Sequence, residues 1–214
     1  ALLILQFWDS QQVDTLGERV LEQKVQSAYR HASIADEDDT ITADDIKTSA
    51  ELITEYDAYI EKLKSHRIRL GWPEVDDRLR GIAPGEVLTI IAKSGVGKTA
   101  VLQNILRHIA LSHDAISLFC SLEQPLAQVF ERYAQMGNGE AGEDIEDSWH
   151  DPEDRERIAG AVKKDLGNQA LVCGRGLRFE QLDQALDVAE AKVDHPVTVL
   201  AVDYLGLLDT RDLD

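Results

Sequence analysis

The stretch around which this chain is built reads Leu88-Thr89-Ile90-Ile91-Ala92-Lys93-Ser94-Gly95-Val96-Gly97-Lys98-Thr99. An apolar, β-branched run enters a loop of small residues and continues into a helical pattern. The spacing is that of a phosphate-binding P-loop, G-x-x-x-x-G-K-S/T, with Ala92 in place of the first glycine. This pattern predicts a nucleoside triphosphate site. The alternative is a glycine-rich turn that ends by chance in Lys-Thr.

Each position of this loop has a mechanical reason. Gly95 and Gly97 allow the tight turn that points successive backbone N–H groups at phosphate oxygens. Lys98 is expected to reach the β- and γ-phosphates, and Thr99 is expected to offer its hydroxyl to Mg²⁺. The helix that starts near Gly97 directs the positive end of its dipole at the anion. The predicted cofactors are therefore ATP and Mg²⁺, and the predicted cradle comprises Ala92, Lys93, Ser94, Gly95, Val96, Gly97, Lys98 and Thr99.

Composition limits the class of protein. Of 214 residues, 43% are hydrophobic, which is ample for a core. No stretch approaches the roughly 20 apolar residues of a membrane span, and two cysteines are too few for a disulfide framework, which agrees with a reducing cytoplasm. Forty acidic residues against 22 basic ones give a net charge of −18. This balance disfavours a broad nucleic-acid-binding surface but leaves room for a narrow basic channel formed on assembly.

The first part of the chain predicts helices. Apolar residues recur at helical spacing from about residue 13 to 32, and an acidic break follows at 35–40. A second helix is expected at 42–65, with Thr42 and Asp45 as a shortened capping box.

A break in the helical periodicity divides the chain. Gly71 and Pro73 interrupt the pattern after the second helix. We therefore expect a helical N-terminal segment at 1–66 and a second domain at 67–214. The apolar opening at 1–8 predicts either a buried strand or the start of a helix.

In the second domain predicted strands alternate with predicted helices, which indicates a mostly parallel sheet with helices on both faces. An acidic stretch at 138–154 interrupts the alternation. In such a sheet, ligands bind at the carboxyl ends of the strands. The expected strands are 87–92, 115–122, 170–173 and 197–202, and the expected helices are 74–81, 98–111, 125–136, 153–166 and 179–192.

Two of these strands end in an acidic residue. Asp203 closes the apolar strand at 197–202, which is the Walker B pattern, in which an aspartate holds Mg²⁺ directly or through water. Glu123 follows the strand at 115–122 and suits a group that orients the water attacking a γ-phosphate. For Glu123, spacing alone leaves a second interpretation open, a surface glutamate that caps the next helix.

Four short motifs follow one another in the second domain. They are Leu70-Gly71-Trp72-Pro73-Glu74-Val75-Asp76, the P-loop with alanine at its start, Ser121-Leu122-Glu123 followed nine positions later by Arg132, and Val202-Asp203-Tyr204-Leu205. Together they resemble the RecA-like ATPase core of DnaB-type replicative helicases over about residues 69–208. RecA-like ATPases of the RadA and KaiC kind are similar in general layout but less close.

The resemblance implies an α/β, RecA-like P-loop NTPase core in which Glu123 and Lys98 are catalytic and Thr99 and Asp203 hold Mg²⁺. It also implies a homo-oligomer, a hexameric ring, in which ATP hydrolysis drives movement on single-stranded DNA during DNA replication. A linker helix at 42–65 would then dock on the next subunit. In that family the DNA-contacting loops, the sensor glutamine and the arginine finger follow the Walker B strand, so the chain is expected to be a fragment truncated after that strand.

Two alternatives from other classes stay open. One is a regulatory or assembly ATPase in which hydrolysis switches a complex and no DNA is unwound, which the acidic balance favours. The other is a nucleotide-binding interaction module without turnover.

Overall fold

The computed structural model describes residues 2–7, 42–93, 95–112, 115–167, 170–174, 176–179 and 181–204, and for residues 2–7 it describes the backbone. These residues belong to two compact units. One unit contains residues 2–7, Ile68–Ile82 and the described chain from Glu86 onward, and the other contains residues 42–67 and 83–85. The helix predicted at 13–32 and the acidic break at 35–40 lie outside the described residues. None of the described helices is long and apolar enough to cross a membrane.

The predicted helix at 42–65 begins later than expected. Thr42 and Asp45 do interact, since the Asp45 carboxylate accepts hydrogen bonds from the Thr42 N–H at 2.7 Å and from its hydroxyl at 2.8 Å. This pair closes only a 3₁₀ turn, η1 (Ala43–Asp45), because the next residue, Ile46, is extended. A second capping box starts α2 (Ser49–His66): Thr48 and Glu51 bond each other reciprocally.

The apolar side chains at the start of α2 are solvent-exposed in this chain. Leu52, Ile53 and Tyr56 are each more than half exposed, as is Ile46 just before the helix. Exposed residues of this size, gathered on one helix, indicate a surface that is suited to contact another protein.

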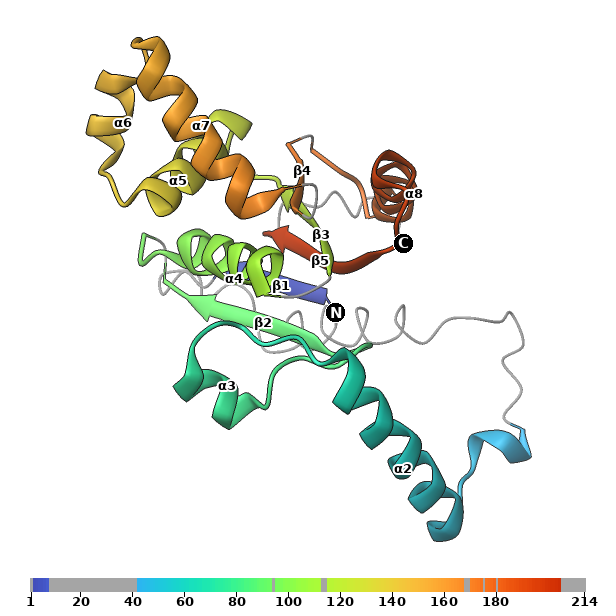
Figure 1. The fold of residues 1–214 in the computed structure, drawn as a ribbon. Coiled ribbons are helices and arrows are strands. Elements are labelled where there is room, and N and C mark those ends of the chain that lie inside the picture. The colour runs from blue at the N-terminus through green and yellow to red at the C-terminus, as the bar shows by residue number, and fades with distance from the viewer. Residues whose placement is uncertain are drawn as a thin grey trace. The chain divides into compact units, whose positions relative to one another are not determined.

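A five-stranded parallel sheet forms the centre of the larger unit (Figure 1). The strand order is β2-β1-β5-β3-β4. The strands are β1 (Leu2–Phe7), β2 (Val87–Ala92), β3 (Ile116–Ser121), β4 (Ala170–Cys173) and β5 (Val197–Asp203), and the helices are α3 (Pro73–Leu79), α4 (Lys98–Ser112), α5 (Leu126–Asn138), α6 (Gly142–Ser148), α7 (Pro152–Leu166) and α8 (Gln181–Val193).

The alternation of strands and helices confirms the α/β prediction, with element ends within two residues of those expected. The element that sequence reasoning missed is α6, which lies inside the acidic stretch at 138–154. It is only seven residues long, and its buried apolar residue is Ile145, so it leaves no helical stripe to detect.

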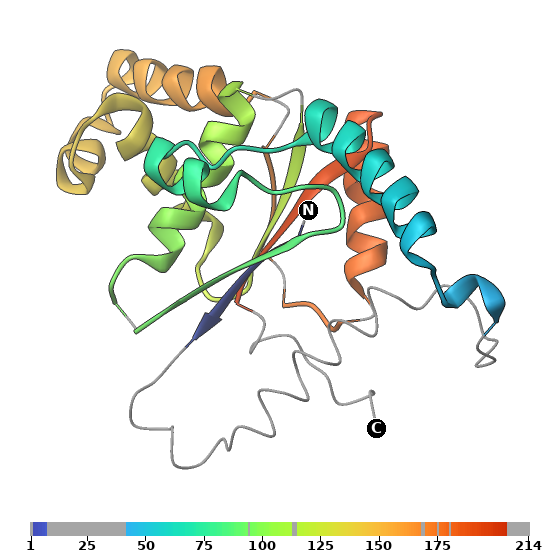
Figure 2. The ribbon, with the colours of Figure 1, turned by 90° about the horizontal axis from the view of Figure 1, so that it is seen from below.

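Helices cover both faces of the sheet, as Figure 2 shows with α4 to one side and α8 to the other. Neighbouring residues of one strand point to opposite faces. Phe119 accordingly belongs to the core shared with α4, α5 and α7, whereas Leu118 and Cys120 pack with α8. Because both faces are covered, β3 is buried along almost its whole length rather than at alternate residues.

The N-terminal strand β1 lies between the P-loop strand β2 and the Asp203 strand β5 (Figure 1). Its register pairs Leu2 with Val87 and Phe7 with Ala92 on one side, and Leu5 with Asp203 on the other. At these six residues the structure therefore differs from the expected helical segment and agrees with the strand alternative. In the described part of the sheet, β2 is an edge strand that pairs with β1 alone.

Proline in the middle of β1 tests this arrangement. We expect Ile4→Pro to lower the free energy of unfolding by about 1–3 kcal/mol, because proline removes the one ladder hydrogen bond that this N–H can donate in a strand paired on both sides. Nucleotide binding should weaken as well, because β2 loses its only described strand partner. Leu2→Pro is the matched control, since a proline is tolerated at the first residue of a strand. Equal urea midpoints for both variants would contradict the arrangement.

Candidate active site

The P-loop joins the end of β2 to the start of α4. Gly95 and Gly97 have φ angles of +77° and +96°, a region that side-chain-bearing residues rarely adopt. A Cβ atom at either position would meet nothing within 4 Å, so backbone conformation rather than space demands glycine here. The predicted strand–loop–helix context is therefore present. Ser94 lies outside the described residues.

The Lys98 side chain spans this loop. Its amino group donates hydrogen bonds to the carbonyl oxygens of Lys93 at 2.9 Å and Ala92 at 3.2 Å. Ala92 is the last residue of β2 and Lys93 is the first residue of the loop. The ammonium group therefore lies beside the start of the loop.

Thr99 and Asp203 meet at this edge of the sheet although they are 104 positions apart in the chain. The Thr99 hydroxyl donates a hydrogen bond of 2.6 Å to the Asp203 carboxylate. Asp203 ends β5 and is almost completely buried, with 1% of its surface exposed. The two residues predicted to hold Mg²⁺ are thus neighbours. Two oxygen groups of this kind fit Mg²⁺, which takes one or two protein ligands and completes its shell with water and phosphate.

The charge of Asp203 is set by opposing effects. Burial raises its pKa above the ordinary value of 3.8, and the nearby negative charge of Glu123 raises it further. The hydrogen bond from Thr99 and the positive charges of Lys98 and Arg132 lower it. Three charged side chains from separate parts of the chain therefore act on Asp203 at this edge.

Glu123 lies beside Asp203, in the segment that follows β3. Ser121 pairs with Asp203 in the sheet, and the Leu122 N–H donates to the Asp203 carbonyl at 2.9 Å. The Glu123 side chain is exposed and its charge reaches Asp203 and Tyr204, where it raises both pKa values. The helix-capping alternative has no support, because α5 begins after Pro125 without a side-chain cap.

A polar network behind Glu123 was not anticipated from the sequence. Arg132 Nη1 donates to the side-chain oxygens of Gln103 and Gln124, each at 2.8 Å. Gln103 is fully buried, and its amide nitrogen donates to the Val129 carbonyl at 3.0 Å. Arg132 was visible only as part of a family motif. For Gln103, the available signal was a polar residue within the apolar face of the helix after the P-loop.

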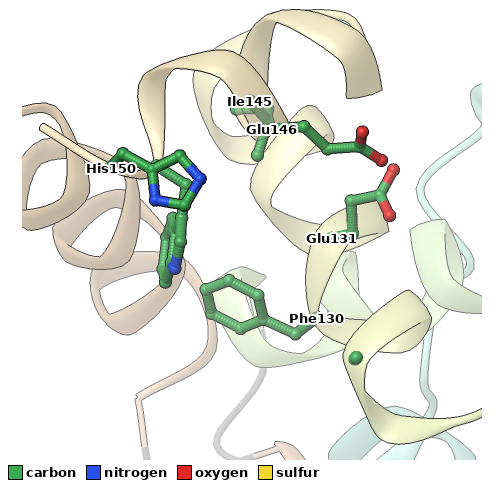
Figure 3. A pocket seen from close by; sticks show the side chains of 7 residues that line it. Phe130, Glu131, Ile145, Glu146 and His150 are labelled. Carbon is green, nitrogen blue, oxygen red and sulfur yellow. The ribbon is translucent and has the colours of Figure 1, made fainter.

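A separate hollow of about 460 Å³ opens between α5 and α6 (Figure 3). Phe130 and Trp149 line it as an edge-to-face pair with ring centroids 5.4 Å apart. Glu131, Glu146 and His150 contribute its polar groups. None of the residues predicted to bind phosphate or Mg²⁺ lines this hollow, so it is distinct from the P-loop edge.

The buried carboxylate of Asp203 predicts a pH-dependent stability effect in Mg²⁺-free protein. Because burial raises the pKa of Asp203 in the folded state, its stabilising contribution is full below pH 3.8 and is lost as the pH rises through the folded-state pKa. We therefore expect Asp203→Asn to raise the urea midpoint at pH 7–8, and this gain to shrink toward pH 4. Asp187→Asn, on the exposed surface of α8, serves as the control. A lower midpoint for Asp203→Asn at pH 7–8 would refute the expectation.

Residues 67–214 match the model of the DnaB-like helicase C-terminal domain. No curated protein sequence matches the chain. Two solved structures are similar at a TM-score of 0.62 and 18% identity. One is an ATPase domain, with 78% of this chain and 60% of that chain covered, and the other is a DnaB-like replicative helicase described with its interactions with primase, with 95% and 47% covered.

These structural matches establish the RecA-like fold, and this chain spans about half to three-fifths of the structures that it resembles. The family match covers more than half of the chain and includes the P-loop, Glu123 and Asp203. The chain belongs to the DnaB-like helicase C-terminal domain family.

Proposed function

We propose that this chain is an ATP-hydrolysing motor domain that couples hydrolysis to movement on single-stranded DNA. The observation that carries the proposal is the hydrogen bond between Thr99 and Asp203. It joins the P-loop helix to the Walker B strand at the carboxyl edge of the sheet, where ligands of such sheets bind. Glu123 stands beside the same edge.

The residues divide the chemistry among them. Backbone N–H groups of the loop and the first turn of α4 would bind the phosphates. Lys98 would exchange its two carbonyl partners for the β- and γ-phosphate oxygens. Thr99 and Asp203 would hold Mg²⁺, which neutralises charge that develops on the phosphates. Glu123 would orient the attacking water and accept its proton.

The proposed partners follow from the family. We propose a homo-oligomer, a hexameric ring, in which α2 is a linker helix docking on the next subunit. Its exposed Leu52, Ile53 and Tyr56 support this role. The division between a helical segment at 1–66 and an ATPase domain at 67–214 is part of the proposal, with β1 as an exception because it belongs to the sheet.

A second candidate function is a regulatory or assembly ATPase that does not move on DNA. The net charge of −18 favours it, because phosphate backbone is normally bound by clustered Lys and Arg. If the chain is instead a DNA-dependent motor, the assembled subunits must bring enough Lys and Arg side chains together to form a local DNA-binding surface.

Two substitutions test the division of labour at the site. Lys98→Ala should abolish ATP binding, because it removes the ammonium group that meets the phosphates. Glu123→Gln should keep ATP affinity and lower kcat by about 10²–10⁴-fold, the range expected for loss of a general base. Binding is measured with a fluorescent ATP analogue and turnover by phosphate release. If the Gln variant hydrolyses ATP at the wild-type rate, Glu123 does not have this role.

DNA dependence separates the two candidate functions. We expect single-stranded DNA to stimulate ATP hydrolysis by the longest natural chain that contains these residues. Binding to that DNA should weaken with a linear slope of log affinity against log salt concentration. Turnover that is indifferent to DNA would favour the regulatory ATPase. ATP binding without any turnover would favour the interaction module.

A further inference from the structure

Glu123 sits between two residues whose positions are fixed by hydrogen bonds. Before it, the Leu122 N–H donates to the Asp203 carbonyl at 2.9 Å. After it, the Gln124 carbonyl accepts from the Ser121 hydroxyl at 2.8 Å, and the Gln124 side chain accepts from Arg132 at 2.8 Å. The first two contacts tie the segment to the ends of β5 and β3. The third ties it to a helix.

Arg132 carries that third contact to the P-loop helix. The same nitrogen, Nη1, donates to Gln124 and to Gln103 of α4, and it has two hydrogens to give. Gln103 is itself held by the Val129 carbonyl, one turn before Arg132 on α5. Because Gln103 is fully buried, its amide is not exposed to solvent and depends on hydrogen-bond partners within the protein. The chain of contacts therefore runs from α4 through one guanidinium group to the residue next to Glu123.

The positively charged guanidinium of Arg132 donates its described hydrogen bonds to neutral groups. Among the described residues it forms no ion pair, and its two hydrogen-bond partners are neutral amides. A charged donor makes these bonds shorter and stronger than neutral ones. The guanidinium also lies close enough to Asp203 to lower its pKa.

We propose that Arg132 is a positioning residue for the proposed hydrolysis: it holds the Glu123 segment, through Gln124, at a fixed place relative to the P-loop helix, through Gln103. This inference rests on the proposed function. Because α4 begins with the residues that meet the phosphates, the contact sets the distance between the γ-phosphate and the Glu123 carboxylate. An error of about 1 Å in such a distance can cost about 100-fold in rate.

Removing the amide of Gln124 is the sharpest test, because its backbone carbonyl and Glu123 both remain. In the longest natural chain that contains these residues, we expect Gln124→Met and Arg132→Met each to lower kcat by about 10- to 100-fold. The KM for ATP and the affinity for a non-hydrolysable analogue should change by less than about threefold, because no P-loop contact is lost. Gln128→Met, an exposed position on α5, is the matched control and should leave kcat unchanged.

A double-mutant cycle shows whether the effect passes through Glu123. In the Glu123→Gln background, Gln124→Met should cause no further loss of kcat, because the group that it positions is already gone. Additive losses would mean that Gln124 acts by another route and would overturn the proposal. We expect the urea midpoints to show that every variant is fully folded at the assay temperature. A loss of kcat in a folded variant then reflects a misplaced Glu123 rather than unfolding.

The two proposals fail in different ways. If Glu123→Gln abolishes turnover while Gln124→Met and Arg132→Met keep the wild-type kcat, the positioning role is wrong and the proposed function stands. If Glu123→Gln retains turnover, the proposed catalytic role is wrong. A second readout does not need turnover: the two Met variants should weaken binding of Mg²⁺–ADP with aluminium fluoride, a mimic of the transferring phosphate, more than binding of ADP. Equal weakening of both complexes would overturn the positioning role.

Discussion

The hydrogen bond between Thr99 and Asp203 is the contact on which the candidate site depends. It forms only if the β2–α4 turn is tight, which the positive φ angles of Gly95 and Gly97 provide, and only if the end of β5 lies near that turn. Strand β1 fixes the second condition, because Leu5 pairs with Ile90 of β2 on one side and with Asp203 of β5 on the other.

At the same edge, an acidic chain brings positive side chains close to a buried carboxylate. The net charge of the chain is −18, yet Lys98 and Arg132 both act on Asp203 at the site. Electrostatic interactions fall off within about 10 Å at ordinary salt concentrations, so the groups at the loop matter more to a phosphate than distant surface carboxylates. The net charge of a chain therefore limits broad binding surfaces, such as one for a nucleic acid backbone, more than it limits a local site such as the proposed phosphate-binding loop.

Sequence reasoning succeeded where the signal is local. The P-loop and the strand ends at Asp203 and Glu123 are short patterns, and the structure brings them to one edge. The place of β1 was not predictable, because pairing Leu2 with Val87 depends on contacts between distant segments, and an apolar run of six residues fits a strand or a helix equally. The start of α2 was misplaced because two Thr-x-x-acid boxes compete, and only the backbone at Ile46 decides between them. The partners of Arg132 depend on the packing of α4 against α5, which periodicity does not specify.

Register is the property that links fold and chemistry in this protein. Thr99 and Glu123 follow the ends of β2 and β3, whereas Asp203 is the last residue of β5 and pairs with Ser121 on one side and Leu5 on the other. A slip of one residue moves a strand by about 3.3 Å and turns each side chain to the opposite face. Such a shift would break the 2.6 Å bond between Thr99 and Asp203. The apolar residues that bury both faces of β3 and β5 therefore also help to position the carboxylates at their ends, because a slip of one residue would turn Phe119 and Val202 away from the sides on which they are buried.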